Sequence, residues 1–323
     1  MRYAFLETPL RLRSLGKTGL RVTELALGTW GLSGDAYGPV DEATQQGVVE
    51  RALEMGISLV DTSDAYGGGR LEQLLGRMLA DRRDVVVVTK GGTDRTTAPP
   101  RKRFDGAYLR TAVERSLRRL AHRRVDVYLL HNPSVAAVEG GDAVDTLRAL
   151  KDEGKIGHWG ASVGDVASGR AALRAGAEVI ELPYNLFHAG DLHRLAGEVV
   201  VRGAGVLAHS TLAFGLLAGD WTKDREFAEG DHRGQRWTRA ELERRIEQLT
   251  AVRFLVHGDI DTLRAAAIRF VLANRIVSCA VLGPRNVAQL EELVREVGMG
   301  PIYLRNEDLI RLADELLAVG VEP

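Results

Sequence analysis

The sequence predicts a (β/α)8 barrel, and three observations support this fold. Eight short apolar runs occur along the chain, without the polar alternation of strands that face water on one side. Each run is followed by a longer amphipathic segment of helical period. The length of 323 residues suits this architecture, in which one domain routinely exceeds ~250 residues. We therefore expect a single barrel domain over residues 1–323.

The predicted strands are the continuous apolar runs, which are typical of parallel strands buried on both faces. They cover residues 24–29, 57–61, 85–90, 125–131, 156–162, 179–185, 205–210 and 279–283. The predicted helices lie near residues 41–55, 70–80, 106–121, 140–153, 166–175, 190–202, 261–274 and 286–296. The third helix is the clearest, because Leu109, Val113, Leu117 and Leu120 recur at helical spacing.

Four further segments are additions to the barrel. Residues 10–23 have the pattern of a hairpin, which we expect to close the bottom of the barrel. Residues 215–240 are polar and rich in glycine, and a long loop after the seventh strand is typical of an active-site lid. Extra helices are predicted near residues 239–256 and 304–318.

Charge and cysteine content exclude several classes of protein. Forty-three Lys and Arg against forty-four Asp and Glu give a net charge of −1, so the basic excess of a nonspecific nucleic-acid binder is missing. The single Cys279 provides neither a disulfide framework nor a cysteine-based zinc motif. No apolar run approaches the ~18 residues of a membrane span, and Glu7 precedes any signal-peptide core. We expect a cytoplasmic protein that binds neither nucleic acid nor membranes.

Two glycine motifs resemble nucleotide-binding sequences only superficially. Residues 16–18 resemble the end of a phosphate-binding P-loop, but Arg11 stands where that motif needs its first glycine. Residues 203–208 have the spacing of a dinucleotide fingerprint, but they precede a strand instead of following one. We expect both motifs to be structural.

Two polar clusters leave alternatives open. His188, Asp191 and His193 are able in principle to bind a metal, but Asp191 serves equally well as a helix cap, and we expect no metal. The basic stretch from Arg95 to Arg103 is either a solvated loop or an anion contact.

Polar side chains stand at the ends of three successive predicted strands. Asp61 ends the second strand, Lys90 the third and His131 the fourth, and Tyr66 follows Asp61 by five residues. Because active sites of such barrels lie at the C-terminal ends of the strands, we expect these four side chains to share a site.

These four residue types suit proton transfer to an oxygen atom. Tyr has an ordinary pKa of about 10, which a nearby ammonium lowers, and Lys90 supplies that ammonium. Asp61 holds Lys90 by an ion pair, while His131 orients the reacting oxygen. The set lacks an activated nucleophile, so another group must attack the carbon atom. Hydride transfer from a nicotinamide cofactor would provide that attack.

The four residues in context resemble the catalytic tetrad of the aldo-keto reductase superfamily. The resemblance covers roughly residues 12–318, and its motifs include residues 28–31, 59–67, 88–90, 128–131, 160–162, 282–286 and 289–292. It implies a (β/α)8 barrel that binds NADPH without a Rossmann fold. The lid-like loop resembles the branch with bacterial sugar and aldehyde reductases and potassium-channel β subunits.

The resemblance also implies which residues bind the cofactor. Ser162 resembles the residue that bonds the nicotinamide carboxamide, and Ser210, Leu212 and Gly215 resemble the loop that faces the pyrophosphate. The adenosine-end site is expected at Gly283, Arg285, Gln289 and Glu292, with Arg285 on the 2′-phosphate. A helix N-terminus attracts phosphate, and Arg supplies a planar fork for its oxygens.

Four positions depart from the family pattern. Val163 stands where Asn is usual, Glu181 where Gln is usual, His209 where an aromatic ring stacks on the nicotinamide, and Leu293 where Asn is usual. The first three concern the nicotinamide end of the site. Glu181 is expected to accept from the carboxamide, and Val163 either leaves that group short of a hydrogen bond or packs beneath the ring.

The leading hypothesis is an NADPH-dependent reductase of aldehydes, ketones or keto-sugars, with Tyr66 as the acid. Candidate walls of the substrate pocket are Trp30, Tyr37, Trp159 and Trp221. The alternatives are a regulatory subunit that binds NADPH and turns over slowly, and an NAD(P)-dependent sugar dehydrogenase. A homo-oligomer is compatible with the sequence.

Overall fold

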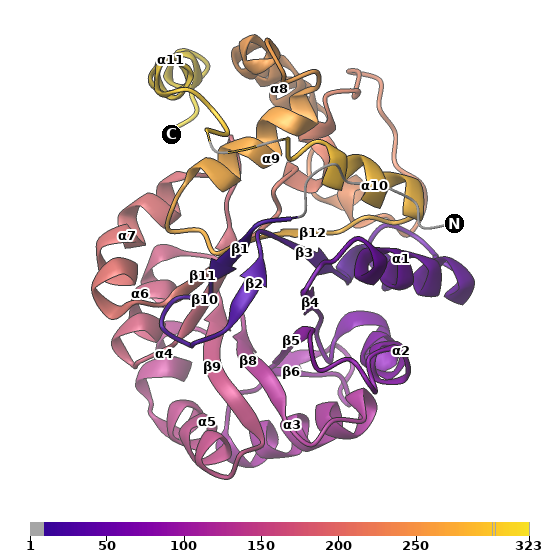
Figure 1. The fold of residues 1–323 in the computed structure, drawn as a ribbon, viewed down its shortest axis with the longest axis vertical. Coiled ribbons are helices and arrows are strands. Elements are labelled where there is room, and N and C mark those ends of the chain that lie inside the picture. Colours follow the sequence, from indigo (N-terminus) through magenta and orange to yellow (C-terminus); the bar gives the residue numbers. More distant parts are fainter. Residues whose placement is uncertain (1–9, 299, 301, 323) are drawn as a thin grey trace.

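The structure, a computed structural model, describes residues 10–298, 300 and 302–322 (Figure 1). The N-terminal stretch through Glu7, where we expect no signal peptide, lies outside these residues. No helix in the described part of the chain is long and apolar enough to span a membrane.

Eight strands form the barrel, and all eight were predicted to within a few residues. They are β3 (Leu25–Gly28), β4 (Leu59–Asp61), β5 (Val86–Gly91), β8 (Val125–His131), β9 (Ile156–Ser162), β10 (Val179–Pro183), β11 (Gly205–His209) and β12 (Cys279–Leu282). Neighbours pair in parallel, and the closed order is β10-β11-β12-β3-β4-β5-β8-β9 (Figure 1). The predicted (β/α)8 barrel is therefore confirmed.

Helices surround the barrel where the amphipathic segments predicted them. They are α1 (Glu42–Glu54), α2 (Arg70–Met78), α3 (Gly106–Leu120), α5 (Asp142–Asp152), α6 (Val166–Arg174), α7 (Gly190–Arg202), α9 (Leu263–Ala273) and α10 (Val287–Arg295). The additional helices α8 (Arg239–Gln248) and α11 (Asn306–Ala318) were also predicted, whereas the short α4 (Val135–Glu139) was not. Side-chain caps fix several starts; for example, Asp105 accepts a hydrogen bond from the backbone N–H of Tyr108 at 3.0 Å.

The N-terminal hairpin closes one end of the barrel, as the sequence predicts. It consists of β1 (Leu12–Ser14) and β2 (Arg21–Thr23), which pair antiparallel and lie across the near end of the barrel in Figure 1. Leu15 and Val22 are fully buried and join the inner core formed by strand residues such as Leu59 and Leu207. The hairpin thereby keeps water from the apolar interior.

Both misleading glycine motifs meet at this closed end. The backbone N–H of Lys17 donates to the Gly203 carbonyl at 2.8 Å. Gly16 has a φ of +56°, and a Cβ there would lie 2.3 Å from the Gly205 nitrogen. The glycines are therefore explained by the close approach of the hairpin turn to the start of β11.

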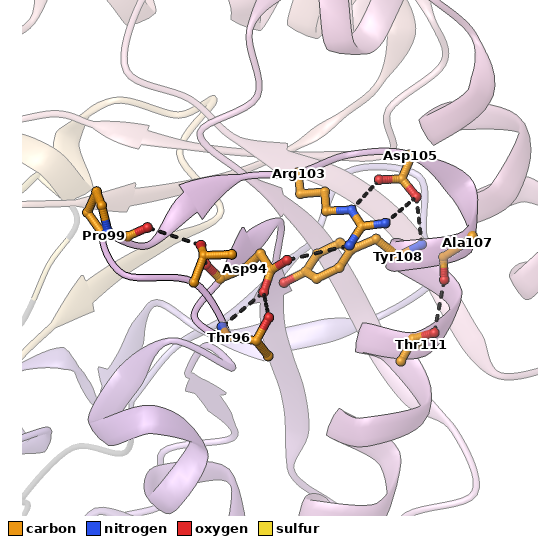
Figure 2. A network of polar contacts seen from close by, with 9 residues as sticks. Asp94, Thr96, Pro99, Arg103, Asp105, Ala107, Tyr108 and Thr111 are labelled. Carbon is orange, nitrogen blue, oxygen red and sulfur yellow. Dashed lines mark hydrogen bonds and ion pairs between the residues drawn. The ribbon is translucent and has the colours of Figure 1, made fainter.

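An inserted hairpin, β6 (Thr93–Asp94) and β7 (Arg101–Lys102), follows β5 and was not predicted. Figure 2 shows how acidic residues hold its basic stretch: Arg103 pairs with Asp105 at 2.6 Å and with Asp94 at 3.5 Å. Lys102 Nζ donates to the His131 carbonyl at 2.6 Å. Arg103 and Lys102 therefore serve structural contacts within the chain.

Candidate active site

A cavity of about 1150 Å³ opens at the C-terminal ends of the barrel strands. This volume exceeds the usual ~300–1000 Å³ of small-molecule pockets. Asp61, Tyr66, Lys90 and His131 all line it. It is also lined by every residue that the resemblance assigned to the cofactor, namely Ser162, Glu181, His209, Ser210, Leu212, Gly215, Gly283, Arg285, Gln289 and Glu292. The structure therefore brings these candidate residues to one site.

Lys90 lies at the centre of a buried group of charges. Its ammonium pairs with the Asp61 carboxylate at the end of β4 and lies 3.1 Å from Glu181 Oε2 on β10. Relative exposure is only 1% for Lys90, 3% for Asp61 and 2% for Glu181. Buried charges are stable only when paired, so each carboxylate depends on the one ammonium.

The three charged groups have pKa values that reflect this arrangement. Burial lowers the pKa of Lys90, but Asp61 and Glu181 outweigh it and hold that pKa above its usual range. Burial and the Glu181 charge raise the pKa of Asp61, against the opposing effect of Lys90. Burial is the largest influence and raises the pKa of Glu181, but Lys90, His209 and His131 together outweigh burial and bring that pKa below its usual value. Lys90 is therefore charged at neutral pH.

Tyr66 lies beside this group, with Lys90 Nζ 5.6 Å from the centre of its ring. Burial is the largest influence and raises the pKa of Tyr66, whereas Lys90 lowers it. The sequence predicted the lowering by Lys90 but not that burial would outweigh it. Tyr66 therefore keeps its proton at neutral pH, as a proton donor must.

His131 meets Tyr66 edge to face, with ring centres 6.1 Å apart. Its Nδ1 lies 3.1 Å from the Ser63 hydroxyl oxygen. Burial, then the Lys90 and Lys102 charges, lower the pKa of His131 to about 3. The imidazole is therefore neutral at neutral pH, and Nε2 is the ring nitrogen left for a substrate.

The loop after β11 has an unusual backbone. Ser210, Ala213 and Phe214 have positive φ angles of 55°, 46° and 63°, and Gly215 has 97°. Non-glycine residues adopt this region rarely, and such residues cluster at functional sites. Successive backbone N–H groups in such turns form concave sites for anions.

Arg285 lies just before α10, whose N-cap is Asn286. Its Nη2 donates to the carbonyls of Gly38 and Pro39 at 3.1 and 3.3 Å. Its buried Nε makes no hydrogen bond to the described part of the chain. A free donor beside a helix N-terminus suits a phosphate group.

Comparison with known proteins identifies the family. The model of the aldo/keto reductase family matches residues 24–299. The chain belongs to this family.

Relatives within the family share most of the chain. Aldo-keto reductase YhdN of Bacillus subtilis is 29% identical over 301 residues, which is 88% of each chain. L-galactose dehydrogenase of Arabidopsis thaliana is also 29% identical and covers 90% of this chain and 89% of its own. The solved structure of glycerol dehydrogenase AKR11B4 from Gluconobacter oxydans has a TM-score of 0.81, 25% identity and 97% coverage of both chains.

In this aldo/keto reductase, Trp30, Tyr37 and Trp221 line the cavity, but Trp159 does not. Trp159 packs in the apolar layer between barrel and helices. Side chains alternate along β9, so the inward position of Ser162 turns Trp159 outward. The expectation for Trp159 was therefore wrong.

The lid segment reaches across to the loop after β3. Tyr37 and Asp231 form a β-bridge, and the His232 backbone N–H donates to the Ala36 carbonyl at 2.9 Å. Trp30 lies beside Tyr37 and His232, with ring centres 5.3 and 4.8 Å away. The lid loop predicted after the seventh strand thus covers part of the cavity.

Sequence reasoning missed Arg236, which lines the cavity with its guanidinium 3.5 Å above the Phe214 ring. The sequence signal for Arg236 was its place beside Trp237 in the aromatic-rich lid.

Sequence reasoning also missed the ion pair between Glu181 and Lys90. That pair was detectable in part, because Val179 faces the inner core and Glu181, two residues on, shares its face.

The remaining departures and the metal candidates are also placed. Val163 is 1% exposed, borders the cavity and packs in the outer apolar layer, which favours the alternative that it serves packing. Leu293 is likewise buried in that layer.

The three residues considered as metal ligands do not converge. His188 contacts Asp191 at 3.2 Å, whereas His193 faces the Tyr184 hydroxyl. Within the residues described, no group of three such side chains is arranged to hold a metal.

Proposed function

We propose that this protein is an NADPH-dependent reductase of small carbonyl compounds in which Tyr66 donates the proton. The observation that carries this proposal is the buried Lys90, which is paired with Asp61 and placed beside Tyr66 under an open cavity. A half-buried acid with an adjacent cation is suited to protonate an oxygen as negative charge develops on it.

The cavity fits a dinucleotide phosphate as well as a small substrate. Its volume is large, and it contains buried polar atoms without partners in the described residues, among them Arg285 Nε and Thr211 Oγ1. Ser162 and His209 would hold the nicotinamide end, Ser210 and Gly215 the pyrophosphate, and Arg285 the 2′-phosphate. When bound, the cofactor supplies hydride to the carbonyl carbon.

The remaining steps belong to the side chains. Tyr66 gives its proton to the carbonyl oxygen, and the Lys90 ammonium stabilises the phenolate that remains. Asp61 keeps Lys90 charged and in place. Neutral His131, held through Nδ1 by Ser63, orients the carbonyl oxygen.

The reverse reaction is the second candidate. Two of the relatives are named as dehydrogenases, one of L-galactose and one of glycerol. These names favour a polyol or sugar as the reduced partner of the reaction.

The direct assay is oxidation of NADPH, followed by its absorbance, across a panel of aldehydes, ketones and keto-sugars. We expect turnover with at least one class, and alcohol-dependent reduction of NADP+ with the corresponding alcohols. Tight NADPH binding with negligible turnover throughout the panel would contradict the proposal and favour a regulatory subunit.

A further inference from the structure

The buried charges around Lys90 do not balance. One ammonium faces two carboxylates, and Lys90 Nζ lies 3.1 Å from Glu181 Oε2 while it also pairs with Asp61. All three residues are at most 3% exposed. Because water cannot screen them, a second buried carboxylate leaves a strong local preference for positive charge.

The other groups that face Glu181 do not supply a second positive charge that would balance the two carboxylates. His209 on β11 and His131 on β8 lie nearby, and burial lowers the pKa of both, so both are neutral at neutral pH. Tyr66 is protonated and carries no charge. Lys102, the next cation, donates to the His131 carbonyl. Glu181 therefore adds negative charge to the wall of the cavity.

We propose that Glu181 makes the site prefer the oxidised nicotinamide ring, which is positively charged, over the neutral reduced ring. The inference rests on the proposed function, in which the nicotinamide occupies the cavity wall formed by Ser162, Glu181 and His209. β9 and β10 pair Ser162 directly with Glu181, so the residue that would bond the carboxamide is next to the carboxylate.

The physical reason is that the two redox forms differ at the ring. Their adenosine and phosphate contacts are the same, so those contacts cancel when the two affinities are compared. An opposite charge within a buried site shifts an equilibrium by about one to three powers of ten. Each tenfold preference for the oxidised form lowers the midpoint potential of the bound couple by about 30 mV. Bound NADPH is then a stronger hydride donor, which favours reduction of a carbonyl.

The test compares the wild type with Glu181→Gln, which keeps the shape and removes the charge. Dissociation constants for NADP+ and NADPH are measured by quenching of tryptophan fluorescence, since Trp30 and Trp221 line the cavity. We expect Glu181→Gln to weaken NADP+ binding at least about tenfold while NADPH binding changes by less than about threefold. Equal changes in both constants, or no change in either, would overturn the inference.

Two controls separate charge from general damage to the site. Arg285→Gln is expected to weaken both redox forms equally, because the 2′-phosphate is common to them. Glu181→Asp keeps the charge and is expected to retain most of the preference for NADP+. Failure of wild-type protein to bind either form would contradict the proposed function itself, whereas binding with an unchanged ratio in Glu181→Gln contradicts the inference alone.

The wild type provides a second measurement that does not depend on a folded variant. Burial and the Glu181 charge raise the pKa of Asp61 to about 7, so raising the pH removes the proton that Asp61 retains. The preference for NADP+ is therefore expected to increase between about pH 6 and pH 9. The titratable groups around Glu181 are Asp61, Lys90, Tyr66, His131, His209 and Lys102. Burial lowers the pKa of both histidines, which leaves them neutral at and above neutral pH. If the ratio of the dissociation constants for NADP+ and NADPH stays constant over this pH range, the inference is also overturned.

Discussion

The Ser63 hydroxyl oxygen lies 3.1 Å from Nδ1 of His131, and so joins the loop after β4 to the end of β8. The same oxygen lies 3.1 Å from the Lys90 carbonyl and accepts from the Ala65 backbone N–H at 3.2 Å. The serine is therefore fixed by the backbone on both sides. It holds the imidazole through Nδ1, whereas the proposed reaction uses Nε2.

Ser63→Ala is expected to lower kcat/KM about threefold to tenfold, because one net hydrogen bond contributes about 0.5–1.5 kcal/mol to the orientation of His131. The dissociation constant of NADPH should stay within about twofold, since Ser63 does not line the cavity. Steady-state kinetics and fluorescence titration check the two values. An unchanged kcat/KM would show that the ring is held by packing alone.

Asp64 is expected to make stability depend on pH. Burial, followed by the Glu72 charge, raises the pKa of Asp64 to about 7, against the opposing effect of Arg119. Between about pH 4 and pH 7 the folded protein therefore keeps a proton that the unfolded chain has lost. The resulting stabilisation is complete below about pH 4 and is lost as the pH rises through about 7.

Asp64→Asn removes this titration while keeping the shape of the side chain. The difference in unfolding free energy, wild type minus variant, should fall steadily as the pH rises from about 4 to 7. Urea unfolding at several pH values measures it. A difference that is constant with pH would show that Asp64 is ionised throughout.

Arg285→Ala is expected to weaken NADPH roughly tenfold to a hundredfold and NADH much less, because a charge-assisted contact to the 2′-phosphate contributes about 1.5–3 kcal/mol. Arg285→Lys, which keeps the charge, should recover part of the loss. The measurement is the dissociation constant of each cofactor for each variant. Equal weakening of NADPH and NADH would mean that Arg285 supports the loop at Gly38 instead of reading the phosphate.

The barrel was predictable because most of its strands are short, largely apolar runs, as in β11 and β12. The predicted fold, combined with the predicted ends of the strands, also placed Asp61, Lys90 and His131 at one site. The β6–β7 hairpin escaped prediction, because its strands have two residues each and its segment contains Pro99 and three basic residues.

Contacts across the barrel were harder to predict than the ends of single strands. The pairing of Lys90 with Glu181 joins β5 to β10; the alternation along β10 indicates that Glu181 faces inward, but not that Lys90 is its partner. Trp159 was misplaced because the expectation considered residue type without the alternation along β9. The net pKa of Tyr66 depends on how deeply it is buried, which only the assembled site determines.

The measurement that most directly tests the central role of Tyr66 is carbonyl reduction by Tyr66→Phe, together with its affinity for NADPH. Loss of a general acid is expected to lower kcat at least about a hundredfold. The dissociation constant of NADPH should stay within about threefold, because the hydroxyl acts on the substrate oxygen and not on the cofactor. Retention of more than about a tenth of the wild-type kcat would contradict the assignment of Tyr66 as the proton donor.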